Sequence, residues 1–475
     1  MELRDKICGL VDAKADRFVA VNDSIWSTPE LDFKETKSAA ALIEVLKAEG
    51  FQVEEGLAGI PTAFVGSWGS GKPVIGILGE FDALPGLSQK AGCPVKEPVE
   101  EGGNGHGCGH CALGSGSLAA AVAVKDYLQE TGKAGTIRYY GCPGEEHGCG
   151  KMFMTRDGVF ADLDAALTWH PGDSNSVWGI SSLANRHIHF HFTGKTAHAA
   201  AAPHMGRSAL DACELMNVGV NYLREHVIPE ARIHYAYLDV GGDAPNVVQG
   251  TATTYYMIRA PKIKQVLELC ERVFDVARGA ALMTGTEMTY EIKQGLCDYM
   301  PNKALSELAA ECFRQVGAPD FDEADFELAR KFRATLSERE RSAPPLALAQ
   351  LLGMPKAMEI AQSGLCDVVL PYAHMPQVAM PGSTDVGDVS YAVPTAQLGS
   401  ACAAVGTGAH TWQMTAQVGS VLGHKGLLTA GKALALTAAR LFEDPSVLER
   451  AKQEHKLNAP DGYLCPVPDD VKPSL

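Results

Sequence analysis

The spacing of hydrophobic residues changes along the chain, between a helical period of three to four positions and the alternation or continuous runs of strands. Residues 1–50 repeat apolar positions at the helical spacing and predict two helices. Val74–Leu78 is a continuous apolar run, which indicates a strand buried on both faces. The first part of the chain is thus predicted to alternate between strands and helices, with strands at 51–53, 62–65, 74–78, 136–140 and 164–168 and a helix at 112–131.

The pattern changes at Arg186–Phe192, where apolar and polar residues alternate with period two. The polar positions are His187, His189 and His191, and a metal site made by these three histidines is a weaker alternative to a half-exposed strand. Residues 185–298 then follow the order β-α-β-β-α-β, which is the split, ferredoxin-like plan. We therefore expect residues 185–298 to form an inserted domain, with helices at 207–227 and 262–283 and strands at 186–192, 231–240, 247–259 and 287–294.

After residue 300 the pattern predicts helices at 303–316, 323–340 and 421–442, followed by a polar tail. Residues 341–375 carry few clear signals. Strand-like residues return at 381–390 and 396–405. Because this part needs the first part to complete a sheet, we predict one α/β catalytic domain made of residues 1–184 and 299–475 and interrupted by the inserted domain.

Composition excludes several classes of function. The 41 Lys and Arg residues against 57 Asp and Glu residues give a net charge of −16, which argues against nucleic acid as a main partner. We also expect no membrane partner, because no run approaches the roughly 20 apolar residues of a membrane helix. The charged N-terminus is unlike a signal peptide. Thirteen cysteines without a repeating pattern indicate reduced thiols, so we expect a cytoplasmic protein.

Asn104–His110 is the stretch most suggestive of chemistry. Four glycines between Glu101 and Gly109 make it a loop that can adopt unusual backbone angles. Cys108 and His110 are two residues apart, so on extended backbone they would point the same way and could hold a metal. The alternative is a glycine-rich turn with an incidental Cys and His.

Further candidates follow predicted strands, where open α/β sheets bind ligands. Glu80 and Asp82 follow the buried strand and either serve the site or cap a turn. Glu145 and Glu146 are adjacent in a Gly/Pro turn, so one could bind a metal while the other faces a water; the alternative is a solvated acidic turn. His170 ends another strand and is a third candidate ligand, although a lone histidine there is more often structural.

Taken in order, several motifs resemble those of the zinc-peptidase-like amidohydrolase family, which includes aminoacylases, carboxypeptidase G-type enzymes and indole-acetyl-amino-acid hydrolases. The resemblance implies a discontinuous two-metal peptidase-like catalytic domain with an inserted ferredoxin-like dimerisation, or lid, domain. It extends over nearly the whole chain and is weakest at about 320–375. The motifs are Cys108-Gly109-His110, Pro143–Gly148, Trp169-His170-Pro171, Gly194–Ala199 and a late His410.

The resemblance also implies roles for individual residues. Glu145 would be the general base, and His198 of the inserted domain would reach the active site of the partner subunit. Asn246 and Arg259 would contact the substrate. Two divalent metal ions, manganese or zinc, would be held by Cys108, His110, Glu146, His170 and His410.

Two positions qualify this ligand set. The family usually has Asp or Asn after Cys-Gly-His, whereas this chain has Cys111, which could be a packing residue, an extra soft ligand or a sign of altered metal choice. His424 is a rival to His410 as the late ligand. We prefer His410 because it follows a glycine-rich strand end.

The activity implied by the resemblance is hydrolysis of the amide bond of an N-acyl amino acid, with an aromatic acyl group favoured and aminobenzoyl-glutamate foremost. The alternatives are other aroyl- or indole-acyl amino acids or dipeptides, or a mainly non-catalytic partner subunit of a related hydrolase. The implied partners are a small-molecule substrate and either a second copy of the chain or a homologous second subunit.

Overall fold

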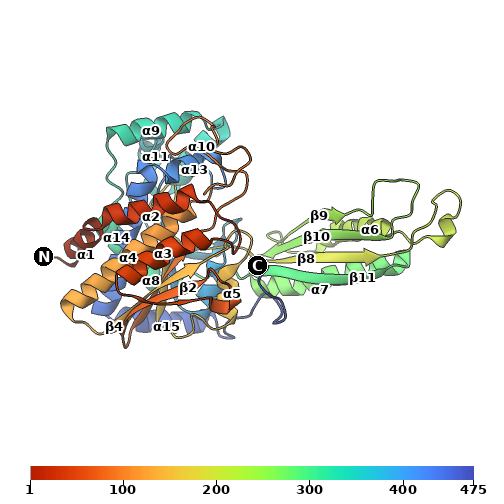
Figure 1. Cartoon of the computed structure of the whole chain (residues 1–475), viewed down its shortest axis with the longest axis horizontal. Coiled ribbons are helices and arrows are strands. Elements are labelled where there is room, and N and C mark those ends of the chain that lie inside the picture. The colour runs from red at the N-terminus through yellow and green to blue at the C-terminus, as the bar shows by residue number, and fades with distance from the viewer. Residues whose placement is uncertain (1) are drawn as a thin grey trace.

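The computed structural model describes residues 2–475 and contains a large mixed sheet, a smaller antiparallel sheet and a short pair of strands (Figure 1). The large sheet has seven strands in the order β1-β2-β4-β3-β5-β13-β6. Its strands are β1 (Gln52–Glu55), β2 (Phe64–Ser70), β3 (Val74–Glu80), β4 (Gly135–Cys142), β5 (Ala165–Gly172), β6 (Ser176–Val177) and β13 (Thr395–Ala401). Strands β7 (Ile180–Ser181) and β12 (Met375–Ala379) form the short pair.

The centre of the large sheet is parallel and buried. Strand β3 lies between β4 and β5, and β5 pairs with β13, all in parallel. Every residue of β3 and of β13 is buried, as expected for parallel strands covered on both faces. The carboxyl ends of these four strands consequently meet at one edge of the sheet, where open α/β folds bind their ligands.

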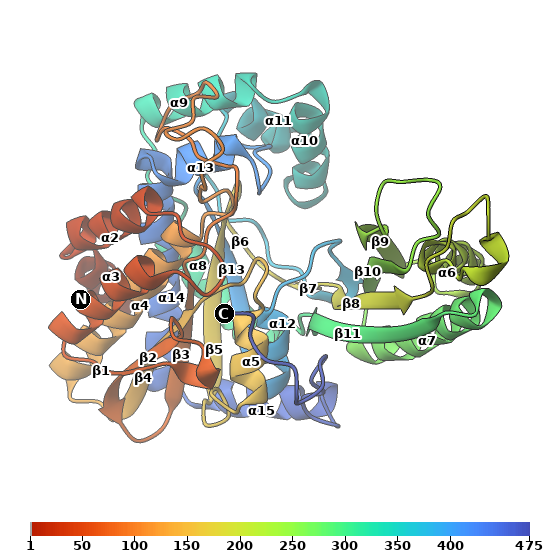
Figure 2. The same cartoon turned by 45° about the vertical axis from the view of Figure 1, so that its right-hand side comes forward.

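Helices cover both faces of the large sheet (Figure 2). One core joins the sheet to α4 and α14, and another lies among β4, α5, α12 and the end of β11. The helices outside the small unit are α1 (Leu3–Asp12), α2 (Ala15–Ser27), α3 (Thr36–Ala48), α4 (His110–Thr131), α5 (Gly150–Arg156), α8 (Lys303–Val316), α9 (Glu323–Ala334), α10 (Glu338–Leu352), α11 (Met354–Ser363), α12 (Val386–Ala392), α13 (Trp412–Val418), α14 (Val421–Glu443) and α15 (Ser446–Asn458).

Residues 184–296, which we call the small unit, project away from the large sheet (Figure 1). They form β8 (Ala184–Thr193), α6 (Ala209–Leu223), β9 (Arg232–Asp239), β10 (Thr251–Ala260), α7 (Ile263–Thr284) and β11 (Glu287–Leu296). The sheet order β11-β8-β10-β9 confirms the ferredoxin-like arrangement, and the α/β fold class is confirmed with it. The chain enters and leaves on neighbouring strands, because Asn185 pairs with Leu296. The domain limits at 184/185 and 298/299 remain predictions.

The prediction of two helices in residues 1–50 was wrong, because the structure has three. The chain turns between Asp12 and Ala15 and separates α1 from α2. At this turn the Lys14 ammonium lies 2.7 Å from Glu49 and 2.6 Å from Asp126. The apolar residues that suggested one continuous helix do face the same core, since Ile7, Val11 and Phe18 all belong to it.

Local pattern also failed in the second half of the chain. The single helix predicted at 323–340 is interrupted, because Ser337 caps the start of α10. The weakly patterned 341–375 region completes α10 and forms α11, while the expected sheet segment at 381–390 contains α12. The polar tail contains α15, whose buried residues are Val447, Leu448 and Ala451. These helices are short, interrupted or half-buried, so their formation depends more on tertiary contacts than on the periodicity of their apolar residues.

Among the helices of residues 2–475, none combines the length and the apolar character that a membrane crossing requires. All thirteen cysteines are free thiols, as the sequence predicted.

The crossing of α4 over β5 and α14 gives a stability prediction. A Cβ atom at Gly116 would lie 2.7 Å from the Trp169 ring and 2.9 Å from the Leu427 backbone oxygen. We expect Gly116→Val to lower the free energy of unfolding by about 1–3 kcal/mol, because this core is overpacked by the new side chain. Denaturant unfolding followed by circular dichroism measures the change.

The matched control is Gly9→Ala in α1, where nothing lies within 4 Å of the added Cβ. This change is expected to be neutral or to stabilise by up to about 1 kcal/mol, because alanine favours helix more than glycine does. Equal destabilisation by the two substitutions would contradict the close crossing at Gly116.

Candidate metal and catalytic centre

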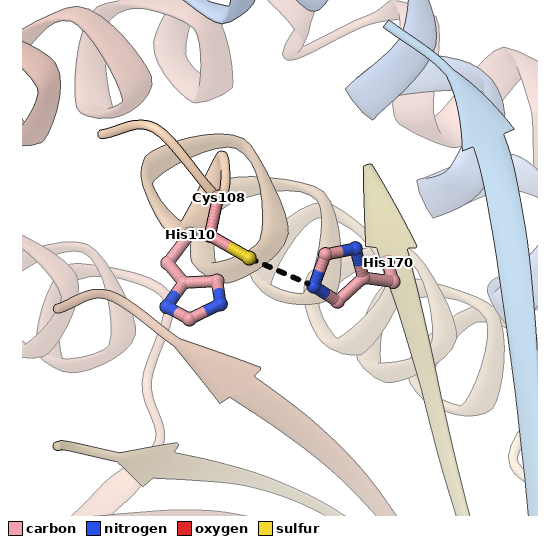
Figure 3. Close-up of side chains that lie close together, drawn as sticks. All are labelled: Cys108, His110 and His170. Atoms are coloured by element: carbon pink, nitrogen blue, oxygen red, sulfur yellow. Dashed lines mark hydrogen bonds between the residues drawn. The ribbon is translucent and has the colours of Figure 1, made fainter. Parts of the chain in front are cut away.

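Cys108, His110 and His170 converge at the carboxyl end of the parallel strands (Figure 3). Cys108 comes from the glycine-rich loop, His110 is the first residue of α4, and His170 lies in β5. The Cys108 Sγ lies 3.4 Å from His170 Nε2. One potential ligand atom from each residue lies within 4.8 Å of the others. The predicted convergence of these side chains is therefore present.

The backbone reason given for that convergence was wrong. Cys108 and His110 do not lie on the extended backbone that was predicted, because Gly109 between them is left-handed with φ of 84° and caps α4. A Cβ atom at Gly109 would also lie 3.0 Å from Pro171. Glycine suits this position because it adopts positive φ without strain and leaves room for Pro171.

A second group joins Cys108 to Glu146 and His410, again with one ligand atom of each within 4.8 Å of the others. His410 Nε2 lies 3.2 Å from Glu146 Oε2. His410 has a left-handed backbone, with φ of 61°, and its backbone N–H donates to the Gly107 oxygen at 2.7 Å. Cys108 belongs to both groups, so the sulfur lies between two sets of possible ligands.

Glu145 belongs to a third group, with Glu80 and His110. It is half-buried and stands among other carboxylates. Burial first, and then the nearby charges of Glu80, Asp385 and Glu146, raise the pKa of Glu145 well above its usual value. A carboxylate in such surroundings binds a proton readily, as a general base must.

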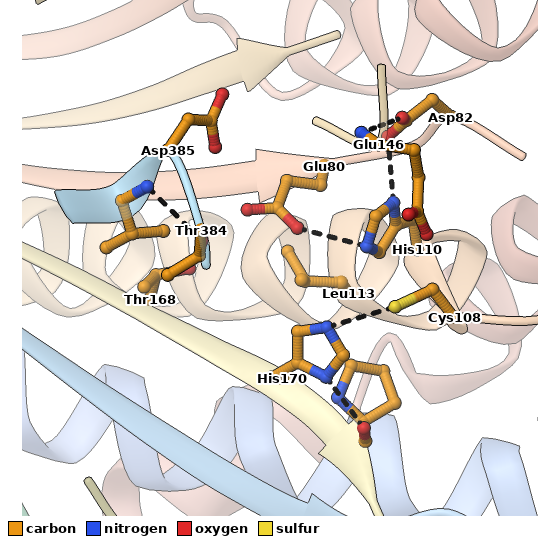
Figure 4. Close-up of polar contacts among 12 residues, drawn as sticks. Glu80, Asp82, Cys108, His110, Leu113, Glu146, Thr168, His170, Thr384 and Asp385 are labelled. Atoms are coloured by element: carbon orange, nitrogen blue, oxygen red, sulfur yellow. Dashed lines mark hydrogen bonds and ion pairs between the residues drawn. The ribbon is translucent and has the colours of Figure 1, made fainter. Parts of the chain in front are cut away.

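Asp82 orients the histidine at the start of α4 (Figure 4). Its carboxylate is 2.8 Å from His110 Nδ1 and accepts the backbone N–H of Glu146 at 2.9 Å. Burial alone would lower the pKa of His110, but Asp82 and Cys108 outweigh it and raise the pKa. With Nδ1 held by Asp82, Nε2 faces the centre, and a cation that replaces the Nε2 proton would be bound as by a metal-ligating histidine.

The residues present fit a pair of divalent cations. His110 Nε2 and Glu146 Oε1 are buried and make no hydrogen bond within residues 2–475, and Nε2 lies 3.3 Å from the carboxylate of Glu80. Burial raises the pKa of the Cys108 thiol, so an adjacent cation is what would favour its thiolate. Thiolate, imidazole and carboxylate ligands together suit zinc, manganese and several related ions.

A buried chain of charges lies behind the centre. Lys151 is completely buried, and its Nζ is 2.8 Å from Glu80 Oε1 and also contacts the Asp385 carboxylate. The Lys151 backbone N–H donates to the other Asp385 oxygen at 2.9 Å. Burial disfavours the charged lysine, but Asp385 and Glu80 more than compensate and raise its pKa. Lys151 thus offsets the negative charge that surrounds Glu145.

Sequence reasoning missed the roles of Lys151, Asp385 and Glu35. Glu35 is buried and accepts the Gly144 N–H at 2.9 Å, which fixes the turn before Glu145. Lys151 and Glu35 carry no local signal, because a single charged residue in sequence gives no indication that it is buried. Glu80 and Asp82 did carry a signal, since both follow a fully apolar strand.

The remaining predicted residues lie on the small unit, away from these groups. His198 is exposed in the loop between β8 and α6, where its Nδ1 accepts N–H groups of Ala200 and Ala201 at 3.2 Å. Asn246 is exposed on a neighbouring loop. Arg259 lies on β10 and donates to the Pro381 oxygen at 3.2 Å.

Three alternatives from the sequence can be placed. His424 pairs with Asp23 at 2.7 Å and belongs to none of the groups described above. Cys111 is buried in the apolar core, which favours the packing alternative. Of the three histidines on β8, His189 and His191 lie with Glu291 rather than with His187, and Glu291 pairs with Lys293 at 2.8 Å.

Comparisons with known proteins give a family and several relatives for this chain. The profile of peptidase family M20/M25/M40 matches residues 76–417. The chain is 44% identical to a subunit of p-aminobenzoyl-glutamate hydrolase from Escherichia coli over 98% of this chain and 97% of that protein. It is 28% identical to mouse Xaa-Arg dipeptidase over 97% of this chain and 94% of that protein.

Two solved structures share the fold at low sequence identity. A Bacillus subtilis protein described as a dinuclear metal binding peptidase from the M20 family has a TM-score of 0.57 and 17% identity, covering 91% of this chain and 99% of that chain. An aminobenzoyl-glutamate utilization protein from Klebsiella pneumoniae has a TM-score of 0.58 and 15% identity, covering 90% and 96%.

The buried lysine gives a prediction for this centre. Lys151→Met should lower the free energy of unfolding by about 3–5 kcal/mol, because it leaves Glu80 and Asp385 buried without their cation. The control Lys356→Met removes exposed pairs with Glu359 and Asp367 and should cost less than about 1 kcal/mol. Chemical denaturation of both variants tests this, and similar losses would refute the compensating role of Lys151.

Proposed function

The chain belongs to the peptidase family M20/M25/M40 and is a hydrolase of that family, and from this we propose that it cleaves the amide bond of N-aroyl amino acids. The observation that carries the proposal is the convergence of Cys108, His110, Glu146, His170 and His410 beside Glu145. The leading substrate is p-aminobenzoyl-glutamate, because the Escherichia coli relative named for its hydrolysis aligns with almost the whole chain.

The cofactor in this proposal is a pair of divalent metal ions, manganese or zinc. His110 and His170 would serve with Cys108 on one side, Glu146 and His410 with Cys108 on the other. The similar Bacillus subtilis protein is described as dinuclear. Bound metals of this kind lower the pKa of water towards about 7 and withdraw electron density from a carbonyl.

Glu145 is the general base in this proposal. Its carboxylate takes a proton from the attacking water and delivers it to the departing amide nitrogen, so that one residue serves both proton transfers. Burial first, and then the neighbouring carboxylates, raise its pKa, so Glu145 takes the proton of the water more readily and holds it until the nitrogen departs. Lys151 keeps Glu80 and Asp385 charged and fixed behind it.

The substrate carboxylate is assigned to the side of the small unit. Arg259 is half-buried, and its contacts are the Pro381 oxygen and the Met257 sulfur. No carboxylate within residues 2–475 forms an ion pair with it, which leaves the guanidinium available for a two-pronged contact. Asn246 would be the second substrate contact on this side, whereas His198 would be a catalytic residue in the active site of the partner subunit.

The partner in this proposal is a second copy of the chain. Strand β9 is an edge of the small sheet, and Leu238 is 54% exposed on it. Val218 and Tyr222 of the neighbouring α6 are 49% and 75% exposed. An open strand edge beside apolar side chains is the kind of surface that pairs two identical units. A homologous second subunit is the alternative, since the Escherichia coli relative is named as one subunit of its enzyme.

Replacing the base tests the reaction. Glu145→Gln should reduce kcat for p-aminobenzoyl-glutamate by about 10²–10⁴-fold, because the amide cannot accept the proton of the water. Metal content measured by elemental analysis should stay near that of the unmodified chain. Exposed Glu54→Gln is the control and should keep full activity.

The same assay separates catalysis from a supporting role. If the purified chain alone, loaded with manganese or zinc, turns over no N-acyl amino acid, the catalytic proposal is wrong and the alternative of a supporting subunit stands. If Glu145→Gln retains substantial activity, another group is the base.

Mixing two inactive variants tests whether His198 acts across the dimer. His198→Ala and Glu145→Gln chains, dissociated and reassembled together, should recover about a quarter of the unmodified activity. Half of the dimers then contain one chain of each kind, and in each of these one of the two active sites has both an intact Glu145 and the partner's intact His198. Steady-state turnover of the mixture measures the recovery. Activity no higher than that of the separate variants would place His198 outside the partner's site.

A further inference from the structure

A cavity of about 450 Å³ opens directly beside the candidate centre. His170 lines it, so the cavity and the ligand groups share one side chain. Its other walls come from the segment that follows β5, from the loop before α13 and from the first turns of α10. The cavity therefore depends on a helix from the region whose sequence pattern is weakest.

The walls of the cavity suit a flat apolar group. Trp178 and Met414 supply the largest apolar side chains, and Pro171, Ala343 and Pro344 complete them. The Trp178 ring lies with its centroid 6.2 Å from that of His170 and 6.4 Å from that of Tyr299, which fixes its position. The cavity volume is within the range of small-molecule pockets, which are mostly apolar with few polar groups.

Charge decides which half of a substrate this cavity can accept. Two carboxylates, Asp173 and Glu340, line it, and none of the lining residues is Lys or Arg. A glutamate side chain or an α-carboxylate would meet these two like charges there and no lining Lys or Arg to offset them. Arg259, which has no carboxylate partner among residues 2–475 and donates to the Pro381 oxygen, lies on the small unit instead.

The α10 wall is held by specific contacts. Gly406, with φ of 95°, brings the loop so close to α10 that a Cβ atom at Gly406 would lie 2.6 Å from the backbone oxygen of Glu340. The Gly406 N–H donates to Asp173 at 2.8 Å. Arg333 donates to the Arg341 backbone oxygen at 2.7 Å. The backbone of α10 at Glu340 thus packs against Gly406, while the Glu340 carboxylate accepts the Ser337 N–H at 2.7 Å.

We propose that this cavity binds the aromatic ring of the acyl group, and that α10 sets the preference for aroyl over small acyl groups. In an aroyl amide the ring is bonded directly to the carbonyl carbon, so it must lie next to the hydrolysed bond, as this cavity lies next to His170. An amino group on the far side of the ring meets Asp173 and Glu340 as hydrogen-bond acceptors. The inference rests on the proposed function and adds the binding site of the acyl half.

The test fills the cavity from α10. Ala343→Trp should lower kcat/KM for p-aminobenzoyl-glutamate by about tenfold or more while N-acetylglutamate changes by less than about twofold, because only the ring needs the occupied space. Leu346→Trp is the matched control: Leu346 lies in the same helix, is 61% exposed and does not line the cavity. This control should leave both substrates unchanged.

Binding of p-aminobenzoate, measured by calorimetry, gives a readout independent of turnover. It should weaken about tenfold in Ala343→Trp and stay unchanged in Leu346→Trp. Equal losses for aroyl and acetyl substrates, or unchanged p-aminobenzoate binding, would overturn the assignment of the cavity. If the unmodified chain hydrolyses neither substrate, the proposed function itself fails. In that case the effect of Ala343→Trp on p-aminobenzoate binding still decides whether the cavity holds the ring: weaker binding supports the assignment, and unchanged binding overturns it.

Discussion

The carboxylate of Asp82 is the contact on which the whole centre depends. It follows β3, receives the His110 ring at the start of α4, and accepts the backbone N–H of Glu146 after β4. One buried side chain therefore fixes three segments that are far apart in sequence. Because the hydrogen bond to Nδ1 sets which histidine nitrogen faces the centre, it controls chemistry as well as position.

Assembling so many acidic groups in one place carries an electrostatic cost, and the surrounding structure offsets it. Glu80, Asp82, Glu145, Glu146 and Asp385 all lie within or behind the centre. Lys151 neutralises part of this charge from a completely buried position, and the His110 ring lies against Glu80 and Asp82. The remaining excess of negative charge and the open histidine nitrogen are what a divalent cation would complement.

The helices and strands with a clear hydrophobic period could be predicted from the sequence, and so could the convergence of most of the candidate site residues. The order β-α-β-β-α-β was readable because each element of the small unit has a clear period, and Glu80 and Asp82 stood out after an apolar strand. Lys151 could not be found, because only the fold shows that it points between Glu80 and Asp385. Helix α10 was hidden by Pro344 and Pro345 in its interior, residues that normally argue against helix. Its place in the fold comes from the capping of Ser337 and from contacts with the loop at Gly406.

The pairing of Asn185 with Leu296 has a consequence for how such a protein can change over evolutionary time. The two points at which the chain crosses between the large sheet and the small unit are neighbours on adjacent strands, about 5 Å apart. A segment with adjoining ends can be lengthened, shortened or replaced by another compact piece without stretching the large sheet that bears the candidate metal ligands. The small unit is in this sense a modular insertion, which can change while the strands of the large sheet keep their positions.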